Sequence, residues 1–308
     1  MKTISRPRLA WLAGAFLVAG VLAGWWWLGR APSANQMLAW LPEGDGPTVY
    51  VDFALLRRTG LLDRLAGDAA MAEEDYRAFI GATGFDFRKD LDAALVRWRE
   101  DATLLVLAGR FDQKRLEQYA QTQGGRCVNG LCSLEAATPG RRISFVRLGR
   151  GVLALATAGD AMAAGMISKD NRTPAPDAPL SSAWLMLPKA SLRSTAGLPA
   201  GLSAFLEALG GAERAVLLPR PTQAGVDLVL EAPCTSPAVA GRVADRLTKA
   251  TSLLKSLLSR EGKEPARDDL SGVLTAGTFR GDGAVVRGFW PLPKEFLDKL
   301  SGEAANPD

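Results

Sequence analysis

Residues 127–132 are Cys-Val-Asn-Gly-Leu-Cys, and this short stretch predicts a β-hairpin that begins a run of strands. Asn-Gly is the strongest short hairpin signal, because both residues accept the positive φ of a two-residue type I′ turn. With the turn at Asn129-Gly130, Val128 faces Leu131 and Cys127 faces Cys132. The sequence therefore predicts antiparallel strands on both sides of this turn.

The two cysteines of this hairpin are placed for a disulfide. If Val128 and Leu131 form the hydrogen-bonded pair at the turn, the cysteines occupy the next, closer pair, with Cα atoms about 4.5 to 5.5 Å apart. This separation suits a structural Cys127–Cys132 bridge, and an oxidising exoplasmic compartment favours it too. A redox-active pair is the alternative. We expect Cys234 to be a buried small side chain at a strand end, with an intermolecular bond as the alternative.

Apolar runs and turn signals on both sides of the hairpin predict one α+β unit over residues 47–167. Asp112 is the expected N-cap of a helix in this unit. The other elements are strands at 48–53, 91–98, 103–108, 143–148 and 152–158, and helices at 54–66, 71–84, 113–122 and 160–167.

A similar order of elements follows residues 168–182, which are rich in Pro, Ser and Asp and predict a linker. Ser236-Pro237 opens a long helix with a cap and an N1 proline. The other elements are strands at 183–187, 215–218, 226–231, 272–279 and 284–290, a turn at 281–283, and helices at 198–209 and 294–300.

These two orders predict an α+β fold of two weakly diverged repeats, 47–167 and 183–301. Their antiparallel or mixed sheets would be covered by helices on one face. Chance agreement of a common element order is the alternative. We expect residues 302–308 to be a disordered tail.

The N-terminal segment predicts a membrane anchor that precedes this body. The 21 residues Leu9–Gly29 contain no charged side chain, and such a helix is about 31 Å long, which matches the hydrocarbon core of a bilayer. Three basic residues precede the run and one follows it, which predicts a cytoplasmic N-terminus. The three tryptophans at positions 25–27 would form the outer aromatic belt. Residues 1–30 are therefore expected to be a cytoplasmic tip and a single-pass anchor in the inner membrane, followed by a stalk over 31–46.

Two alternatives to the anchor follow from the same residues. Ala31-Pro32-Ser33 loosely fits a signal-peptide cleavage site, although cleavable apolar regions are usually shorter than this run. A lipoprotein is disfavoured because Trp25 stands where the lipidated cysteine would be. In each case residues 31–308 are expected to face the periplasm or another exoplasmic space.

The charge of the chain argues against nucleic acid as a partner. The chain has 37 Lys and Arg against 33 Asp and Glu, and four of the basic residues lie in residues 1–30, which contain no acid. Residues 31–308 therefore carry 33 charges of each sign, and binding to phosphate backbones lacks its usual electrostatic drive. We expect the bilayer, through residues 9–29, and an envelope protein as partners.

Residue types restrict the chemistry as well. The chain has no histidine, which excludes Ser-His-Asp, Cys-His and His-based metal sites. The acids Asp86, Asp90 and Asp92 fail as a calcium loop, because Leu91 stands where glycine is required. Glu73, Glu74 and Asp75 are read as the first turn of a helix. The sequence therefore indicates no catalytic, cofactor-binding or metal-ligating residue, and we expect no cofactor.

Tyr50-Val51-Asp52 and Gly60-Leu61-Leu62-Asp63, taken with the anchor and the repeated body, resemble uncharacterised membrane-anchored exported proteins of bacteria. The resemblance implies a location and an architecture, and it implies no activity.

Three classes of function stay open. The favoured class is a membrane-tethered interaction or scaffold protein without enzymatic activity, which presents its sheet face or helices to another envelope protein. The second is a carrier or chaperone for an apolar ligand or lipid, suggested by an apolar stripe on helix 243–258; packing of this stripe on the sheet is the alternative. A carboxylate-dependent hydrolase ranks third. The stripe consists of Val243, Leu247, Leu253, Leu254, Leu257 and Leu258.

Overall fold

The structure is a computed structural model that describes residues 31–66, 73–174, 177–193, 200–222, 225–262 and 264–300. The chain divides into residues 1–33 and a compact unit of residues 34–308, which contains all of the described strands of the fold. The predicted anchor over 9–29 and the predicted tail over 302–308 lie outside the described residues. Within the described ranges, no helix is both long enough and apolar enough to cross a bilayer.

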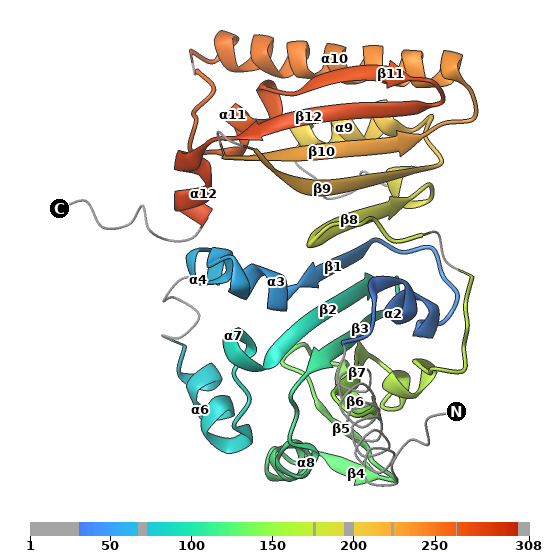
Figure 1. The fold of residues 1–308 in the computed structure, drawn as a ribbon, viewed down its shortest axis with the longest axis vertical. Helices are drawn as coiled ribbons and strands as arrows, with labels where there is room; N and C mark the ends of the chain where they lie inside the picture. Colours follow the sequence, from blue (N-terminus) through green and yellow to red (C-terminus); the bar gives the residue numbers. More distant parts are fainter. Residues whose placement is uncertain are drawn as a thin grey trace, which may run out of the picture. The chain divides into compact units, whose positions relative to one another are not determined.

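The described strands form one twelve-stranded sheet, in the order β11-β12-β10-β9-β8-β1-β2-β3-β7-β6-β5-β4 (Figure 1). All of the strand pairs in this sheet are antiparallel. The α+β class is therefore confirmed, with a single antiparallel sheet. The strands are β1 Thr48–Asp52, β2 Leu91–Trp98, β3 Ala102–Gly109, β4 Arg126–Val128, β5 Leu131–Glu135, β6 Arg142–Gly149, β7 Val152–Ala158, β8 Ala183–Pro188, β9 Arg214–Thr222, β10 Gly225–Pro233, β11 Thr278–Asp282 and β12 Val285–Leu292.

Helices lie in some of the connections between these strands, and the others are short turns or loops. Asp112 accepts a hydrogen bond from the backbone N–H of Arg115, which confirms the predicted cap of α8. Ser236 accepts one from Val239 at the start of α10, as its Ser-Pro sequence predicts. The helices are α2 Ala34–Trp40, α3 Phe53–Arg58, α4 Leu61–Ala66, α6 Glu74–Thr83, α7 Phe87–Asp90, α8 Gln113–Thr122, α9 Ala200–Leu209, α10 Pro237–Arg260, α11 Leu270–Thr275 and α12 Lys294–Leu300, with 3₁₀ turns η1 Ala163–Met166 and η2 Ser191–Arg193.

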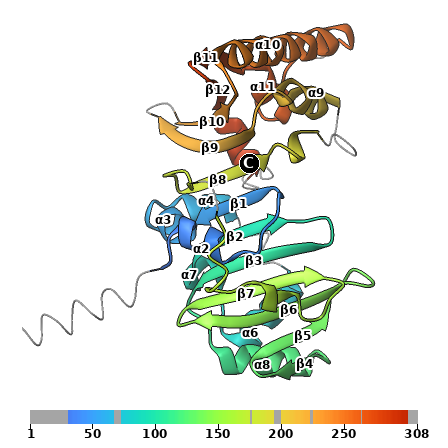
Figure 2. The ribbon, with the colours of Figure 1, turned by 90° about the vertical axis from the view of Figure 1, so that its right-hand side faces the viewer.

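Strands β1 and β8 join the two halves of the sheet, where they lie side by side (Figure 2). Thr48 is opposite Met186, and Val51 is opposite Ala183. Each strand would otherwise expose a row of unpaired backbone groups, so their pairing removes two edges. On the two sides of this junction the strand orders are β1-β2-β3-β7-β6 and β8-β9-β10-β12-β11, which correspond position by position; the first half adds the hairpin β4-β5 at its outer end.

The hairpin and its disulfide are confirmed. Asn129 and Gly130 have φ of 52° and 79°, and Cys127 pairs with Cys132 across β4 and β5. The cysteines are bonded, with Cα atoms 4.0 Å apart. This separation is a little shorter than the sequence predicts, and the bridge closes the outermost pair of strands of the sheet.

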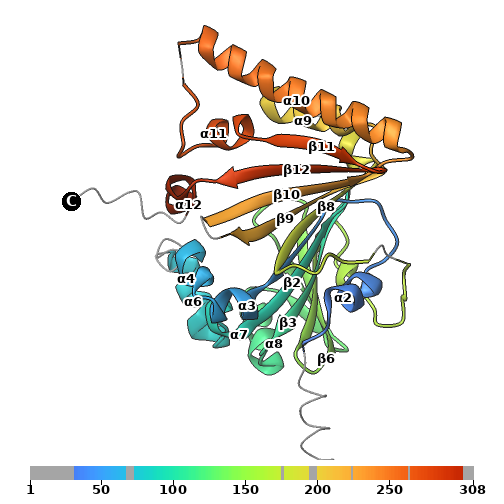
Figure 3. The same cartoon turned by 45° about the horizontal axis from the view of Figure 1, so that its top comes forward.

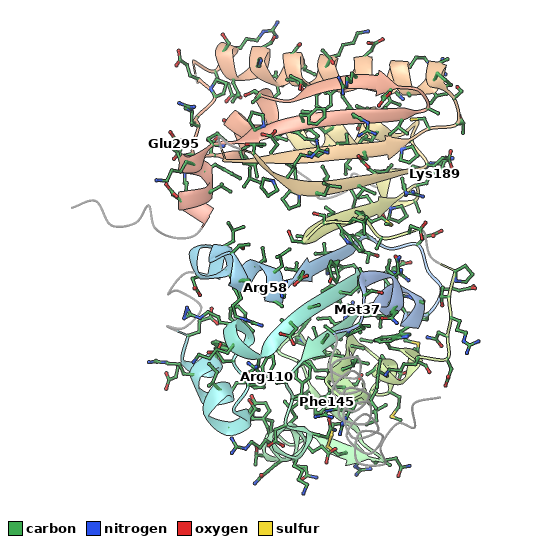
Figure 4. The ribbon with its side chains drawn as sticks, in the orientation of Figure 1. Met37, Arg58, Arg110, Phe145, Lys189 and Glu295 are labelled. Carbon is green, nitrogen blue, oxygen red and sulfur yellow. A yellow bond between two sulfur atoms is a disulfide. The ribbon has the colours of Figure 1, made fainter. Side chains whose placement is uncertain are left out.

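The stalk predicted over 31–46 is wrong for much of its length, because residues 34–40 form α2. Met37, Leu38 and Leu41 are at most 1% exposed and belong to the main core. Figure 4 marks Met37 on α2, in front of the strands. The prolines and glycines that suggested a stalk flank this helix instead: Pro32 precedes it and Pro42 follows it.

Residues 168–182, predicted as a linker, are held against α2 where they are described. The backbone N–H of Ser168 donates to the Trp40 carbonyl at 3.0 Å, and that of Thr173 donates to the Ala39 carbonyl at 3.0 Å. The Thr173 hydroxyl donates to the Leu41 carbonyl at 2.7 Å. The last carbonyl groups of a helix have no hydrogen-bond donor within the helix. At the end of α2, residues 168–173 supply the missing donors.

Three predicted elements differ from the structure. The strand predicted at 272–279 is wrong over residues 272–275, which belong to α11; Asp269 caps this helix by accepting hydrogen bonds from the N–H groups of Ser271 and Gly272. The helix predicted at 160–167 is only the 3₁₀ turn η1. The helix predicted at 54–66 is split into α3 and α4 at Gly60, whose φ of 70° ends the first helix.

The sheet has two faces with separate cores. The α2 face carries Leu95, Leu104, Val106 and Trp184, which pack with α2 and η1. In the second half of the sheet, residues of the α10 face such as Leu230 and Val286 pack with α9, α10 and α11. In the first half of the sheet, the α10 face is covered by α8 through Leu116 and Ala120. In Figure 1, α2 lies in front of the sheet and α9 lies behind it.

Candidate interaction surface

The α2 face is covered differently in the two halves of the sheet. In the first half, Leu104 and Val106 of β3 and Ala154 of β7 are fully buried. In the second half none of the described helices packs on this face, and the strands β9, β10, β12 and β11 carry charged and aromatic side chains there. Figure 1 views this part of the sheet directly.

Strand register identifies the residues of this uncovered area, because directly opposed residues of antiparallel strands share a face. Val229, which is itself fully buried, lies opposite Leu218 on one side and Phe289 on the other. Phe289 in turn lies opposite Thr278 on the edge strand β11. We define the open patch by eight residues of this face, each of them half-buried or exposed: Leu218, Arg220, Asp227, Glu231, Arg280, Asp282, Arg287 and Phe289.

Phe289 lies at the centre of the open patch between two arginines. The guanidinium carbon Cζ of Arg220 is 5.8 Å from the centroid of the Phe289 ring, and that of Arg280 is 5.9 Å from it. Both distances are within the range of a cation–π interaction. Arg220 comes from β9 and Arg280 from β11, so strands on either side of the β10-β12 pair supply the two cations.

The other charges of the open patch are arranged around Arg287. Its Nη1 lies 3.1 Å from Glu231, and its Nε lies 3.0 Å from Asp282. Among the described residues, by contrast, Arg220 and Arg280 have no ion pair within 4.0 Å. Asp227 is opposite Arg220 in the register but does not reach it. The patch therefore presents two guanidinium groups without an ion-pair partner among the described residues.

The acidic cluster beside α7 serves the fold. Asp86 is 7% exposed and accepts hydrogen bonds from the Arg88 N–H at 3.0 Å and the Tyr76 hydroxyl at 3.3 Å. Asp90 forms an ion pair with Arg110 at 3.0 Å, and Asp92 forms one with Arg57 at 2.8 Å. Over the described ranges, no group of three or more Cys, Asp or Glu is arranged to hold a metal ion.

Titratable groups with shifted pKa values lie outside the open patch. A hydrogen bond from Lys299 lowers the pKa of Asp268, and one from Ser271 lowers the pKa of Asp269. Burial raises the pKa of the Cys234 thiol above its usual value. Cys234 is 9% exposed just after β10, as a buried small side chain at a strand end. These groups cap a helix, pair ions or fill the core.

The apolar stripe on α10 divides into two parts. Val243 and Leu247 are fully buried and pack on the sheet, whereas Leu253 is 55% exposed and Leu257 is 45% exposed. Helix and sheet lie close at the N-terminal end of α10 and diverge toward its C-terminal end (Figure 3). The packing alternative is therefore correct for the first half of the stripe.

None of the open-patch residues is a functional residue predicted from the sequence. A usable signal was present in the predicted strand 284–290, where Arg287 and Phe289 alternate with Val286, Gly288 and Trp290. An apolar face opposite a face of arginine and phenylalanine indicates that the second face is accessible. The convergence of Arg220 and Arg280 on Phe289 depends on strand pairing across the sheet, which no local pattern reveals.

Comparison with known proteins found no matching family model and no match among curated proteins. Crystal form I of TP0453 is similar over 90% of this chain and 100% of its own, at 11% identity and a TM-score of 0.46. Crystal form III of TP0453 is similar over 86% of this chain and 97% of its own, at 10% identity and a TM-score of 0.45. What this protein does has to be inferred from its own residues.

Proposed function

We propose that the protein is a membrane-held interaction module without enzymatic activity, and that its open patch binds an acidic segment of another envelope protein. The observation that carries this proposal is the position of Phe289 between Arg220 and Arg280, neither of which has an ion pair among the described residues. Aromatic residues and arginine are enriched in protein interfaces and in their energetic hot spots. A solvated sheet face without a partner is the alternative.

The chemistry of the patch favours a carboxylate as the bound group. A guanidinium group donates two parallel hydrogen bonds to a carboxylate, and its flat face can stay on an aromatic ring while it does so. Phe289 holds the two guanidinium groups near one another, which reduces the side-chain freedom lost on binding. A partner segment with two or more Asp or Glu residues and an apolar side chain fits this arrangement.

The proposed location is the exoplasmic side of the inner membrane, with the N-terminus in the cytoplasm, residues 9–29 as a single-pass anchor and residues 31–308 in the periplasm. The uncharged run and its basic flank support this location. The disulfide between Cys127 and Cys132 is consistent with export to an oxidising compartment. The resemblance to membrane-anchored exported bacterial proteins points the same way.

The repeats belong to the same proposal. We infer that residues 47–167 and 183–301 are diverged copies of one unit. The corresponding strand orders of the two halves, and the helix that follows the third strand in each, support this inference. If the copies diverged, the α2 face stayed apolar and covered in the first and became the open patch in the second.

A charge-reversal experiment tests the interaction. The full chain would be chemically cross-linked in its native membranes, and partners would be identified by mass spectrometry. We expect Arg220→Glu with Arg280→Glu to abolish the main cross-linked species, because the variant repels an acidic segment. Arg58→Glu with Arg77→Glu is the matched control: both arginines are exposed, and the change in net charge is the same. Equal loss in both variants, or no loss in either, would refute the open patch as the binding site.

A lipid or apolar-ligand carrier is the second candidate, supported by the exposed Leu253 and Leu257 at the end of α10. Bound lipid that stays with the protein after delipidating purification, in proportion to protein and reduced by Leu253→Ser, would favour the carrier over the interaction module. A carboxylate-dependent hydrolase has no specific observation in its favour.

A further inference from the structure

An exposed row of side chains runs along α10 on a side that the sheet does not cover. Positions 242, 246, 249, 253, 257 and 260 follow one another at intervals of three or four residues, so they lie on one side of the helix. All six side chains are exposed. The members of this basic-leucine row are Arg242, Arg246, Lys249, Leu253, Leu257 and Arg260.

The row is separate from the side of α10 that builds the core. The buried residues of this helix are Ala240, Val243, Ala244, Leu247 and Thr251, and no residue beyond Thr251 is buried. Leu253 and Leu257 are 55% and 45% exposed. None of the four cations of the row has an ion pair within 4.0 Å in the part of the chain that the structure describes. Arg246 packs close to Gly211, just after the end of α9. Charge pairing among the described residues does not explain why the cations and leucines of the row are aligned.

We propose that the basic-leucine row docks α10 on an anionic lipid surface. A helix that lies in a membrane interface places Leu side chains at the acyl boundary and Lys or Arg at the headgroups. From Arg242 to Arg260 the row is about 27 Å long, at 1.5 Å per residue, so it presents an extended, one-sided line of charge and apolar groups to a flat surface. Four cations lie on this line, with the exposed Asp245 beside it as the nearest acid in the helix, and the excess of positive charge complements anionic headgroups.

This inference rests on the proposed membrane attachment. An anchor keeps the folded unit near the bilayer at a high effective concentration, so that a weak surface contact is occupied. The row and the open patch consist of different residues on different elements. Docking of α10 would therefore leave the open patch available for a protein partner.

The test uses the full chain with Leu257→Cys labelled by an environment-sensitive dye. The label is selective, because Cys127 and Cys132 are bonded and Cys234 is buried. The protein would be reconstituted into vesicles of phosphatidylcholine alone or mixed with phosphatidylglycerol. We expect a blue shift and protection from an aqueous quencher only in the mixed vesicles, with reversal at high salt. The same label at Leu180→Cys, an exposed site outside the row, should respond in neither.

Two lysines of α10 provide a matched pair of variants. Lys249→Glu, in the row, should remove most of the blue shift, whereas Lys255→Glu, on another side of the same helix and equally a charge reversal, should leave it intact. Equal effects of the two variants would overturn the proposal, as would identical emission in both kinds of vesicle. A response that requires an added protein and not phosphatidylglycerol would reassign the row to a protein partner and also overturn it.

Flotation of the full chain with phosphatidylcholine vesicles measures membrane attachment through the anchor, independently of the dye. Failure to float refutes the membrane attachment. Flotation without a dye response in the mixed vesicles refutes only the docking of α10.

Discussion

Tyr50 shows how one residue connects the two halves of the sheet. It lies in β1 opposite Leu95 of the first half and Trp184 of the second. Its ring stacks on Trp184, with centroids 5.7 Å apart and planes 21° from parallel. Tyr50 is 8% exposed, and burial, with a smaller contribution from the charge of Asp52, raises the pKa of its hydroxyl to about 12.

This pKa predicts a loss of stability in alkali. The phenol of Tyr50 ionises near pH 10.0 in the unfolded chain and near 12 in the folded protein. The contribution of the neutral phenol to the free energy of unfolding is therefore fully present below pH 10. It is lost as the pH rises from 10 through 12, and the loss is about 2 to 3 kcal/mol at 1.36 kcal/mol per pKa unit. Urea unfolding measured at several pH values checks this. Tyr50→Phe should reduce the loss, and an unchanged pH dependence in that variant would contradict the assignment.

The disulfide gives a second prediction at this scale. Protein unfolded without reductant should expose one thiol, that of Cys234, and protein unfolded with reductant should expose three. Cys127→Ser with Cys132→Ser should lower the free energy of unfolding by about 2 kcal/mol, because the bridge closes only a short loop. Thiol titration and denaturant unfolding check the two parts. Three free thiols without reductant would contradict the bridge.

Among the elements, α2 differs most from its prediction, and the reason is physical. A helix of seven residues has little stability alone. It forms here because Met37 and Leu38 enter the main core and because residues 168–173 supply partners for its last carbonyl groups. These contacts join positions more than a hundred residues apart, which a local pattern does not reveal.

Leu38→Ala should therefore destabilise the whole folded unit. A fully buried leucine truncated to alanine costs about 2 to 5 kcal/mol, and Leu38 is 1% exposed. The free energy of unfolding, measured with urea, checks this. Leu180→Ala is the control, since Leu180 is fully exposed and should change stability by less than about 0.5 kcal/mol. A stable Leu38→Ala variant would mean that α2 is the stalk the sequence suggested.

Elements with strong local signals could be predicted from the sequence, and elements that depend on distant contacts could not. The Asn129-Gly130 turn, the Asp112 cap and the Ser236-Pro237 helix start are determined within a few residues, and all three are present. The strand predicted at 272–279 is wrong over residues 272–275, because short apolar runs fit a strand and a helix equally well. The capping residue Asp269 of α11 was the signal that decides between them.

At the scale of the whole molecule, pairing of β1 with β8 makes one sheet from two halves with corresponding strand orders. The first half covers its α2 face with α2 and η1. The second half leaves the open patch on that face, with Phe289 between Arg220 and Arg280. Sequence patterns predicted most of the strands but neither their continuity nor this convergence, because both depend on which strands are neighbours.

The most direct test of the proposed interaction is site-specific photo-cross-linking in native membranes. A photoreactive phenylalanine would replace Phe289 in the full chain, and the same group would replace the exposed Leu180 as the control. We predict one main cross-linked protein at position 289 and none at 180, with the attachment point in an acidic segment. Arg220→Glu with Arg280→Glu should remove that product. Equal labelling at the two positions, or no product at 289, would contradict the open patch as the functional surface.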